Sequence, residues 1–297
     1  MTPDYANGKV YGLPITLHTL NQVFERTMSP PEAKVFLAGL TYKIEQPRNF
    51  EEQALATIGQ DLYELFFKGY TQKQWGRHPR EIPARVFLRL PLRFSYDDRY
   101  FTQRFQGIPA DGYTQMVHAM LDHPRVETQP ATAFHRQMIA DHEHTFFTGS
   151  LDDYFGRDMG TLPYRTLDFA HQIAVGDQQG CAVMNFPDPS VAHTRVTEHK
   201  HFAPWEKHRE TVVTKEFSRD AEEGDIPFYP LRAVGGEELL TAYRARAEQL
   251  TNVTFLGRLG TYRYLDMDKA IGEALTAARG FLARQSAQLS SKALFKL

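Results

Sequence analysis

The first third of the chain places apolar residues at helical spacing. Ser29 precedes two prolines, which is typical of a helix start, because proline fits the first turn, where its missing N–H is no loss. Asn49, with Glu52 three residues later, resembles a capping box, and Asp61 with Glu64 repeats the signal. These signals predict short helices with short connections, as in a small bundle. The apolar positions of the helices are Val35, Phe36, Leu40, Phe50, Ala54, Leu55, Ile58, Leu62, Leu65 and Phe66.

A β-type pattern follows after residue 110, where several runs alternate apolar and polar residues. Such alternation suits an antiparallel sheet with one face in water. The expected strands cover 144–150, 164–175, 181–186, 194–202 and 211–217. A last strand leads into a glycine turn over 253–260, and Asp266 is placed to cap a closing helix. One face of that helix carries Ala270, Ile271, Ala274, Leu275 and Leu282.

Length and composition place the chain among ordinary globular proteins. Its 297 residues suit about two domains, and its 42% hydrophobic and 24% charged residues are typical of soluble proteins. A formal net charge of -2 argues against binding to nucleic acid or to a membrane surface. The single Cys181 excludes an intrachain disulfide and favours a reducing compartment. No membrane-length apolar run and no signal peptide are found, so we expect a cytoplasmic location.

Aromatic and arginine residues are concentrated in residues 68–94. Tyr70 and Trp75 can offer flat faces to a base, while an arginine offers a fork of donors to phosphate oxygens. Arg89 and Arg93 flank a proline, which predicts a stiff turn at this point. The residues alone leave two interpretations open: a nucleotide diphosphate site, or helix packing with solvated arginines, which is the commoner use of aromatic residues in helices.

Two further stretches have the composition of ligand sites. Residues 255–271 predict a strand, a turn and a helix N-terminus, an arrangement that binds anions, with Arg258 beside it. Gly-x-x-Gly is common in turns, so this signal is weak by itself. Histidines 199 and 201 would share one face of a strand, as zinc ligands do. Because Lys200 and Arg195 add positive charge and no cysteine is near, we interpret His193, His199, His201 and His208 as polar strand residues and expect no metal site.

Six motifs, in order, resemble the UDP-galactopyranose mutase family. They are KGYTQKQWGR, PLRFSYDDRYF, QGIPADGYTQM, TRVTEHKHF, VVTKEF and GRLGTYRYLDMDKAI, and the match runs from about residue 8 to about residue 280. The resemblance implies an isomerase that interconverts UDP-galactopyranose and UDP-galactofuranose, the precursor of galactofuranose in cell-surface glycans. It also implies FAD, whose reduced flavin rather than a protein side chain is the nucleophile.

The resemblance further implies roles for individual residues. Tyr70 and Trp75 match aromatic residues of the family's uridine site. Arg89 matches a mobile-loop arginine that closes on the diphosphate, and Arg195 matches its fixed partner. Asn185 matches a polar contact to the substrate, and three tyrosines match hydroxyl donors to phosphates. The implied substrate contacts are Phe66, Phe67, Tyr70, Thr71, Trp75, Arg89, Tyr100, Asn185, Arg195, Tyr229 and Tyr264. The implied flavin contacts are Arg165, Gly257, Arg258, Asp266 and Met267.

The family's N-terminal βαβ unit, with its glycine-rich dinucleotide fingerprint, is not found in this chain. On the order of eighty residues would carry such a unit. A truncated gene, a start placed too late and a divergent fragment remain open as explanations. We therefore expect the chain alone to bind FAD weakly or not at all and to aggregate or form oligomers. An inactive remnant that binds UDP-sugar, or that pairs with a complete mutase subunit, is the alternative function.

The resemblance and the patterning together predict an α+β fold with an incomplete Rossmann-like FAD-binding domain. The predicted domains are a helical substrate domain at 15–105, a partial FAD-domain segment at 106–158 and an antiparallel substrate domain at 159–235. A C-terminal strand and helix of the FAD domain follow at 236–284, and 285–297 is expected to be a frayed tail.

Overall fold

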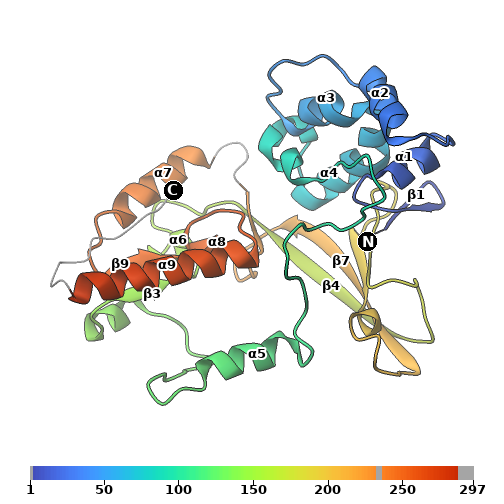
Figure 1. The fold of residues 1–297 in the computed structure, drawn as a ribbon. Helices are drawn as coiled ribbons and strands as arrows, with labels where there is room; N and C mark the ends of the chain where they lie inside the picture. Colours follow the sequence, from blue (N-terminus) through green and yellow to red (C-terminus); the bar gives the residue numbers. More distant parts are fainter. Residues whose placement is uncertain (1–2, 232–235, 287–297) are drawn as a thin grey trace. The chain divides into compact units, whose positions relative to one another are not determined.

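A computed structural model describes residues 3–231 and 236–286 of the chain. Helices combine with a mostly antiparallel sheet, so the predicted α+β class is confirmed. The chain forms two compact units (Figure 1). The first unit comprises 1–128 and 167–219, and the second comprises 129–166 and 220–297. The predicted division into functional domains stays a prediction, and the predicted tail lies almost entirely outside the described residues.

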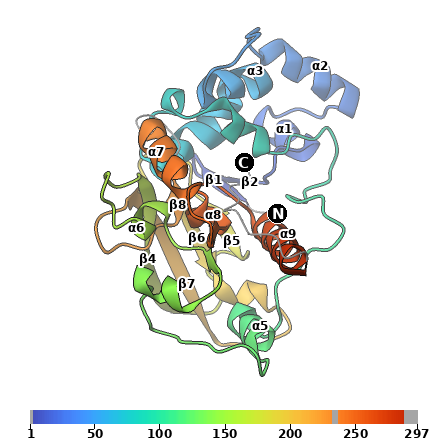
Figure 2. The same ribbon diagram turned by 90° about the vertical axis from the view of Figure 1, so that its left-hand side faces the viewer.

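The helices of the first unit follow one another closely, as in a small bundle. α2 packs against α3, and the two helices lie side by side in Figure 2. A π-helix at Tyr63–Lys68 joins α3 to α4 without a loop. The helices are α1 (Leu17–Val23), α2 (Pro30–Leu40), α3 (Phe50–Leu62), α4 (Gly69–Trp75) and α5 (Gly112–Leu121), with 3-10 turns at Pro79–Glu81 and Ala84–Arg89.

Two of the three predicted helix starts are confirmed. The backbone N–H of Ser29 donates to Glu32 Oε2 at 2.8 Å, and Asn49 Oδ1 accepts the backbone N–H of Glu52 at 2.9 Å. The third start is displaced: a kink divides α3 just before Asp61, and the helical segment that contains Asp61 begins after this kink. The chain bends two residues earlier, at Gly59, where φ is 77°. A Cβ there would lie 2.6 Å from the carbonyl oxygen of Leu40, so the bend requires glycine.

The core of the first unit lies between α1, α2, α3 and the π-helix and contains most of the predicted apolar positions. The prediction that Val35 lies in the core is wrong, because 74% of its surface is exposed. Ala33 and Leu37 are the buried residues of α2, because packing against α3 selects the face opposite Val35, two residues away in either direction.

The sheet of the first unit has the strand order β2-β1-β5-β6-β7-β4. Its strands are β1 (Asp4–Ala6), β2 (Lys9–Tyr11), β4 (Tyr164–Val175), β5 (Val183–Asn185), β6 (Arg195–Glu198) and β7 (Glu210–Asp220). β4 has the predicted bounds, and it begins in the second unit. The predicted strand 194–202 is too long, because β6 ends at Glu198 and a 3-10 turn follows at His199–Phe202.

The register of four strands brings four polar residues into one row. Asp4 on β1 pairs with Asn185 on β5, which pairs with Arg195 on β6, which pairs with Glu216 on β7. β1 and β5 are parallel, whereas the other two pairs are antiparallel. Residues directly opposite each other lie on the same face of a sheet. The side chains of this row form the sheet part of the candidate site described below.

The second unit contains a two-stranded parallel sheet of β3 (Thr145–Phe147) and β9 (Val253–Phe255). A further strand, β8 (Tyr229–Pro230), pairs with the first residues of β4. Its helices are α6 (Leu151–Tyr154), α7 (Glu237–Ala247), α8 (Gly257–Gly260) and α9 (Met267–Ser286), with a 3-10 turn at Arg136–Asp141. Aromatic residues of β3, α6 and β9 form its core.

The closing helix α9 begins directly after Asp266, as predicted. Its apolar face is largely in water: Ile271, Leu275 and Leu282 are 55%, 51% and 59% exposed. None of the helices in residues 3–231 and 236–286 combines the length and apolarity needed to cross a lipid bilayer.

Candidate functional site

Arg195 occupies the centre of a polar cluster in the first unit. Its Nη2 donates to the hydroxyl of Tyr70 at 3.1 Å, and its Nε donates to Asn185 Oδ1 at 3.4 Å. Its Nη1 lies 3.6 Å from Glu216 Oε2. These three partners orient the guanidinium, while 34% of the Arg195 side chain remains exposed. A fixed, accessible guanidinium is suited to binding a phosphate.

Tyr70 lies on α4 and contributes a neutral hydroxyl. Burial raises the pKa of Tyr70, and Arg195 opposes the shift. The phenol therefore stays protonated at neutral pH. Because its oxygen accepts from Arg195, its own O–H can donate to a ligand oxygen. Three predicted substrate residues, Tyr70, Asn185 and Arg195, are thus brought together from α4, β5 and β6.

Asp4 lies at one end of the row that contains Asn185 and Arg195, and it was not predicted. Its Oδ1 accepts the Asn185 Nδ2–H at 2.9 Å, and the residue is only 1% exposed. Burial raises the pKa of Asp4 to about 7, against the opposing effects of Asn185 and Arg195. No short motif marks this aspartate, because its partner is 181 residues away.

Lys73, one turn beyond Tyr70, was also missed by the sequence analysis. Its Nζ donates to the carbonyl oxygens of Asp188 and Val191 at 2.9 Å, of His193 at 3.0 Å, and of Phe186. Burial lowers the pKa of Lys73 to about 8. The ammonium ties the loop between β5 and β6 to α4, so it helps to hold Asn185 and Arg195 near Tyr70.

The other predicted uridine residues lie in or against the core. The ring of Phe66 packs edge-on against Tyr11 at 5.4 Å, and that of Phe67 packs against Phe87 at 5.6 Å. Thr71 is 3% exposed, and Trp75 packs partly buried against the same core. The packing interpretation of this stretch therefore explains most of its aromatic residues, whereas their contact with a base stays a prediction.

Arg89 and Tyr100 lie in more exposed parts of the first unit. Arg89 ends the 3-10 turn Ala84–Arg89 and is exposed, just before the proline that predicted a turn. Tyr100 is 44% exposed, and its ring lies 5.0 Å from that of Phe101. Their roles at the diphosphate stay predictions.

Arg258 organises a second cluster, in the second unit. The rings of Tyr229 and Tyr264 stack in parallel, 5.7 Å apart and 11° from coplanar. The Arg258 guanidinium lies 4.5 Å from the Tyr264 ring and 5.4 Å from the Tyr229 ring, which are cation–π distances. Its Nη2 donates to the carbonyl oxygen of Leu265 at 2.7 Å. Three predicted residues therefore contact one another here.

Arg165 lies on β4, which pairs with the strand β8 that carries Tyr229. It lies opposite Tyr229 in the β4–β8 register, is 3% exposed, and places Nη1 2.7 Å from Asp220 Oδ1. Asp220 is half exposed, so Arg165 is a buried cation with a partner at the surface. The remaining predicted flavin residues lie near the carboxyl ends of β3 and β9.

Glycines lie close to the carboxyl ends of these two parallel strands. Gly257 follows β9 with φ 74°, a conformation that favours glycine. A Cβ on Gly260 would lie 2.8 Å from the carbonyl oxygen of Phe147 at the end of β3. Asp266 and the 59% exposed Met267 follow at the start of α9. Ligands of open α/β sheets bind outside the carboxyl ends of parallel strands, so these residues fit a dinucleotide such as FAD.

The predicted strand, turn and helix around Arg258 are confirmed with one change. The turn leads into the single-turn helix α8, and the long helix begins only at Met267. Two separate helices, α8 and α9, therefore take the place of the single helix expected beside Arg258.

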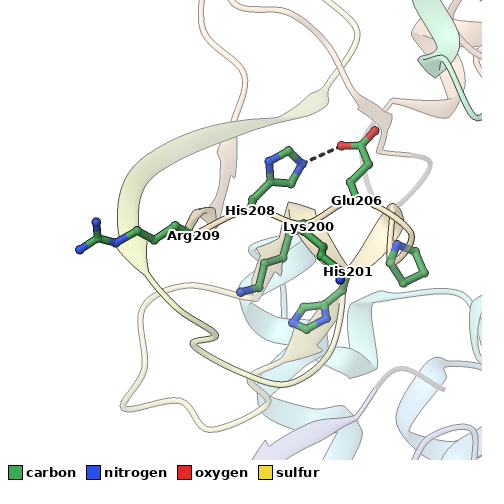
Figure 3. A pocket seen from close by; sticks show the side chains of 7 residues that line it. Lys200, His201, Glu206, His208 and Arg209 are labelled. Carbon is green, nitrogen blue, oxygen red and sulfur yellow. Dashed lines mark hydrogen bonds and ion pairs between the residues drawn. The ribbon is translucent and has the colours of Figure 1, made fainter.

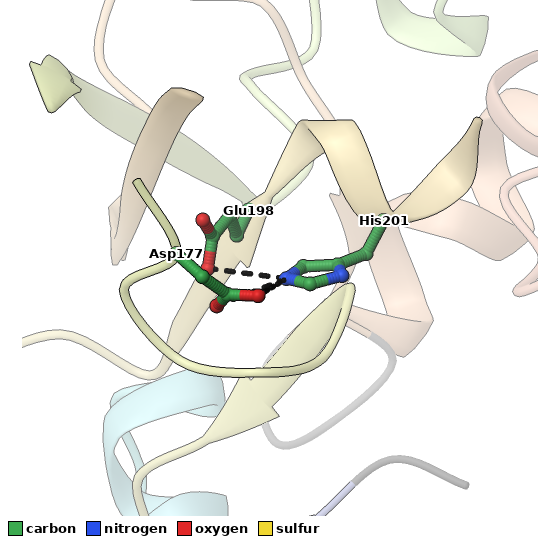
Figure 4. Close-up of side chains that lie close together, drawn as sticks. All are labelled: Asp177, Glu198 and His201. Atoms are coloured by element: carbon green, nitrogen blue, oxygen red, sulfur yellow. Dashed lines mark hydrogen bonds and ion pairs between the residues drawn. The ribbon is translucent and has the colours of Figure 1, made fainter. Parts of the chain in front are cut away.

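The histidines do not lie as predicted, because the strand that carries them ends early. His199 Nε2 contacts Thr214 Oγ1 at 3.0 Å, whereas His201 Nε2 lies 3.2 Å from Asp177 Oδ2 and 3.4 Å from Glu198 Oε2 (Figure 4). The fully buried Glu198 also accepts the backbone N–H groups of Gln178 and Gln179. These bonds tie the turn after β4 to β6.

An open cavity of about 480 Å³ lies beside His201 (Figure 3). His208 Nε2 contacts Glu206 Oε2 across it at 2.7 Å, and Arg209 points away from the other labelled side chains. It contains none of the predicted substrate or flavin residues. Its lining consists of Lys200, His201, Pro204, Glu206, Lys207, His208 and Arg209.

Comparisons with known proteins agree with the motifs. A family model described as "UDP-galactopyranose mutase" matches residues 65–264. A "Probable UDP-galactopyranose mutase" of Klebsiella pneumoniae is 51% identical over 277 residues, which cover 93% of this chain and 72% of that protein. A "dTDP-fucopyranose mutase" of Escherichia coli is 47% identical over 285 residues, which cover 93% and 76%. A crystal structure of reduced UDP-galactopyranose mutase shares the fold, with a TM-score of 0.56 at 14% identity over 89% of this chain and 73% of that one.

Proposed function

The chain belongs to the UDP-galactopyranose mutase family, and we propose that it interconverts UDP-galactopyranose and UDP-galactofuranose. Family membership confirms the resemblance carried by the six motifs. The observation that carries the proposal is the Arg195 cluster, in which a guanidinium and two neutral polar groups converge from separate elements. Such a cluster binds a diphosphate while the protein's net charge stays near zero.

In this proposal the protein's own residues hold the nucleotide while the bond to the sugar breaks and re-forms. Arg195, with Arg89, balances the charge that develops on the departing diphosphate. The Tyr70 hydroxyl donates to a phosphate oxygen, and the hydroxyls of Tyr100, Tyr229 and Tyr264 are assigned the same role. Keeping UDP bound lets it return to the same sugar, because it does not exchange with solvent.

FAD is the proposed cofactor, and reduced FAD supplies the nucleophile when it is bound. Arg165, Gly257, Arg258, Asp266 and Met267 would hold it, near the carboxyl ends of β3 and β9. This assignment treats the second unit as an incomplete Rossmann-like domain, which the parallel β3–β9 pair supports. A cytoplasmic location and a homo-oligomer complete the proposal.

A second substrate is favoured by one specific observation. The relative named for dTDP-fucopyranose is almost as similar to this chain, at 47% identity, as the one named for UDP-galactopyranose, at 51%. Fucose is 6-deoxygalactose, and thymine differs from uracil by one methyl group. The two substrates share the diphosphate that the Arg195 cluster would bind, so this cluster does not discriminate between them.

Turnover with both substrates tests the proposal. The chain is incubated with FAD, dithionite and either UDP-galactofuranose or dTDP-fucofuranose, and the pyranose product is separated by chromatography. Conversion of the UDP-sugar alone supports the first substrate, and conversion of the dTDP-sugar alone supports the second. Binding of UDP in calorimetry without turnover would instead support the alternative of an inactive remnant or a partner of a complete subunit.

A further inference from the structure

We infer that Asp4 is a positioning residue whose carboxyl group sets the orientation of the Asn185 carboxamide and, through it, of the Arg195 guanidinium. The inference rests on the proposed function only in taking Arg195 as the diphosphate contact. Asp4 does not touch the nucleotide in this role. It acts through Asn185, so its effect on binding should disappear when Asn185 is removed.

The geometry has one feature that an ordinary buried aspartate lacks. A carboxamide has a donor end and an acceptor end, and only the acceptor end is compatible with the Nε–H of Arg195. Asp4 Oδ1 accepts from Asn185 Nδ2 at 2.9 Å, which leaves Asn185 Oδ1 facing Arg195 Nε at 3.4 Å. If the amide turned over, two donors would face each other.

The backbone supports this arrangement. Asp4 and Asn185 are register partners in the parallel β1–β5 pair, and the Asn185 N–H donates to the carbonyl oxygen of Pro3 at 2.9 Å. Both side chains therefore start from fixed positions on one face of the sheet. Asp4 is 1% exposed, so water does not compete for the Asn185 amide.

Charge adds a dependence on pH. The charged group that acts on Asp4 is Arg195 on β6, which lowers its pKa, while Asp4 and Glu216 on β7 both raise the pKa of Tyr70 on α4. Burial raises the pKa of Asp4 to about 7. A protonated Asp4 still offers its carbonyl oxygen to Asn185, so the orientation persists in both states. The ionised form adds a negative charge beside Arg195, so a bound diphosphate favours the protonated form and affinity falls as pH rises through 7.

Two substitutions at the same position separate orientation from charge. Asp4→Leu removes the acceptor, and we expect it to weaken UDP-galactose binding about tenfold, the effect of one lost hydrogen bond that orients a charged group. Asp4→Asn keeps an acceptor oxygen without the charge, so it should bind within about twofold of the parent at pH 6 and lose the pH dependence. UDP-galactose is the probe because its diphosphate is a diester with no ionisation near pH 7.

A double-mutant cycle tests the path through Asn185. We expect Asp4→Leu to have no further effect on binding in an Asn185→Ala background. Asp152→Asn is the matched control, since Asp152 is equally buried, at 1% exposure, and is bonded to Leu162 and Tyr164 in the second unit. It should alter the melting temperature without altering the pH dependence of binding.

A readout without ligand keeps the inference separate from the proposed function. In nitrogen-15 spectra of the whole chain, the Asn185 side-chain amide should shift with a midpoint near pH 7, and this shift should be absent in Asp4→Asn. If the parent chain binds no UDP-galactose but this titration is observed, the proposed function fails and the positioning role stands. An Asn185 amide indifferent to pH and to Asp4→Leu, or additive effects of Asp4→Leu and Asn185→Ala on binding, would overturn the inference.

Discussion

Replacing Arg195 with alanine tests the candidate site most directly. The substitution removes a fork that donates to Tyr70 and Asn185 and faces Glu216. A charged hydrogen bond to phosphate contributes about 1.5–3 kcal/mol to binding. UDP affinity should therefore fall roughly 10- to 150-fold.

Glu216 makes the expected loss larger than that of the hydrogen bonds alone. Its side chain is only 13% exposed and lies 3.6 Å from the guanidinium. Without Arg195, this carboxylate faces the incoming diphosphate and repels it. Glu216→Gln in the Arg195→Ala background should therefore recover part of the affinity. Arg195→Lys should also recover only part, because an ammonium cannot present two parallel donors to Tyr70 and Asn185.

Calorimetric titration with UDP measures these effects, and thermal melts show whether the variants fold. Arg219→Ala is the matched control: Arg219 lies on the neighbouring strand β7, and its ion pair with Asp168 is exposed at the surface. It should leave UDP binding unchanged, as surface pairs contribute little. Arg195→Ala with the affinity of the parent chain would remove Arg195, and with it the cluster, from the site.

The remaining predictions concern the base, the loop and the surface. Tyr70→Ala and Trp75→Ala should weaken UDP and UDP-galactose alike, since both ligands carry the base and the diphosphate. A large drop in melting temperature with unchanged UDP affinity would instead assign both residues to the core. Lys73→Met should lower the melting temperature and weaken UDP binding severalfold, because four loop carbonyls lose a hydrogen-bond donor. An unchanged melting temperature would show that Lys73 does not hold the loop between β5 and β6 against α4. Ile271→Glu with Leu275→Glu should raise the monomer fraction in size-exclusion chromatography, because both side chains are about half exposed on α9; a parent chain that is already monomeric would contradict it.

Local signals in the sequence determined the helix starts and most strands. Ser29 and Asn49 are hydrogen-bonded to glutamates three residues away. The strand at 164–175 has the predicted bounds. These features depend on neighbours along the chain, so their pattern is visible before folding. The family resemblance likewise identified Tyr70, Asn185 and Arg195, which the fold brings together, although only Tyr70 and Arg195 lie within the six motifs.

The errors have a common cause in packing. Val35 has helical spacing, but the contact between α2 and α3 selects Ala33 and Leu37 instead. The predicted start at Asp61 is displaced because the Leu40 carbonyl lies close to Gly59. The prediction that His199 and His201 lie on a strand is wrong, because β6 ends at Glu198. The buried carboxylate of Glu198 accepts the backbone N–H groups of Gln178 and Gln179 in a distant turn. In each case a contact distant in sequence overrides a local pattern.

Only the tertiary structure decided which groups control Arg195. Asp4 reaches the site because β1 pairs in parallel with β5, 181 residues later in the chain. Lys73 binds four carbonyls 113 to 120 residues away, and Glu216 enters through the β6–β7 register. A lone buried carboxylate or ammonium has no signature in sequence, because its partners are chosen by strand pairing and by the need to satisfy each buried charge.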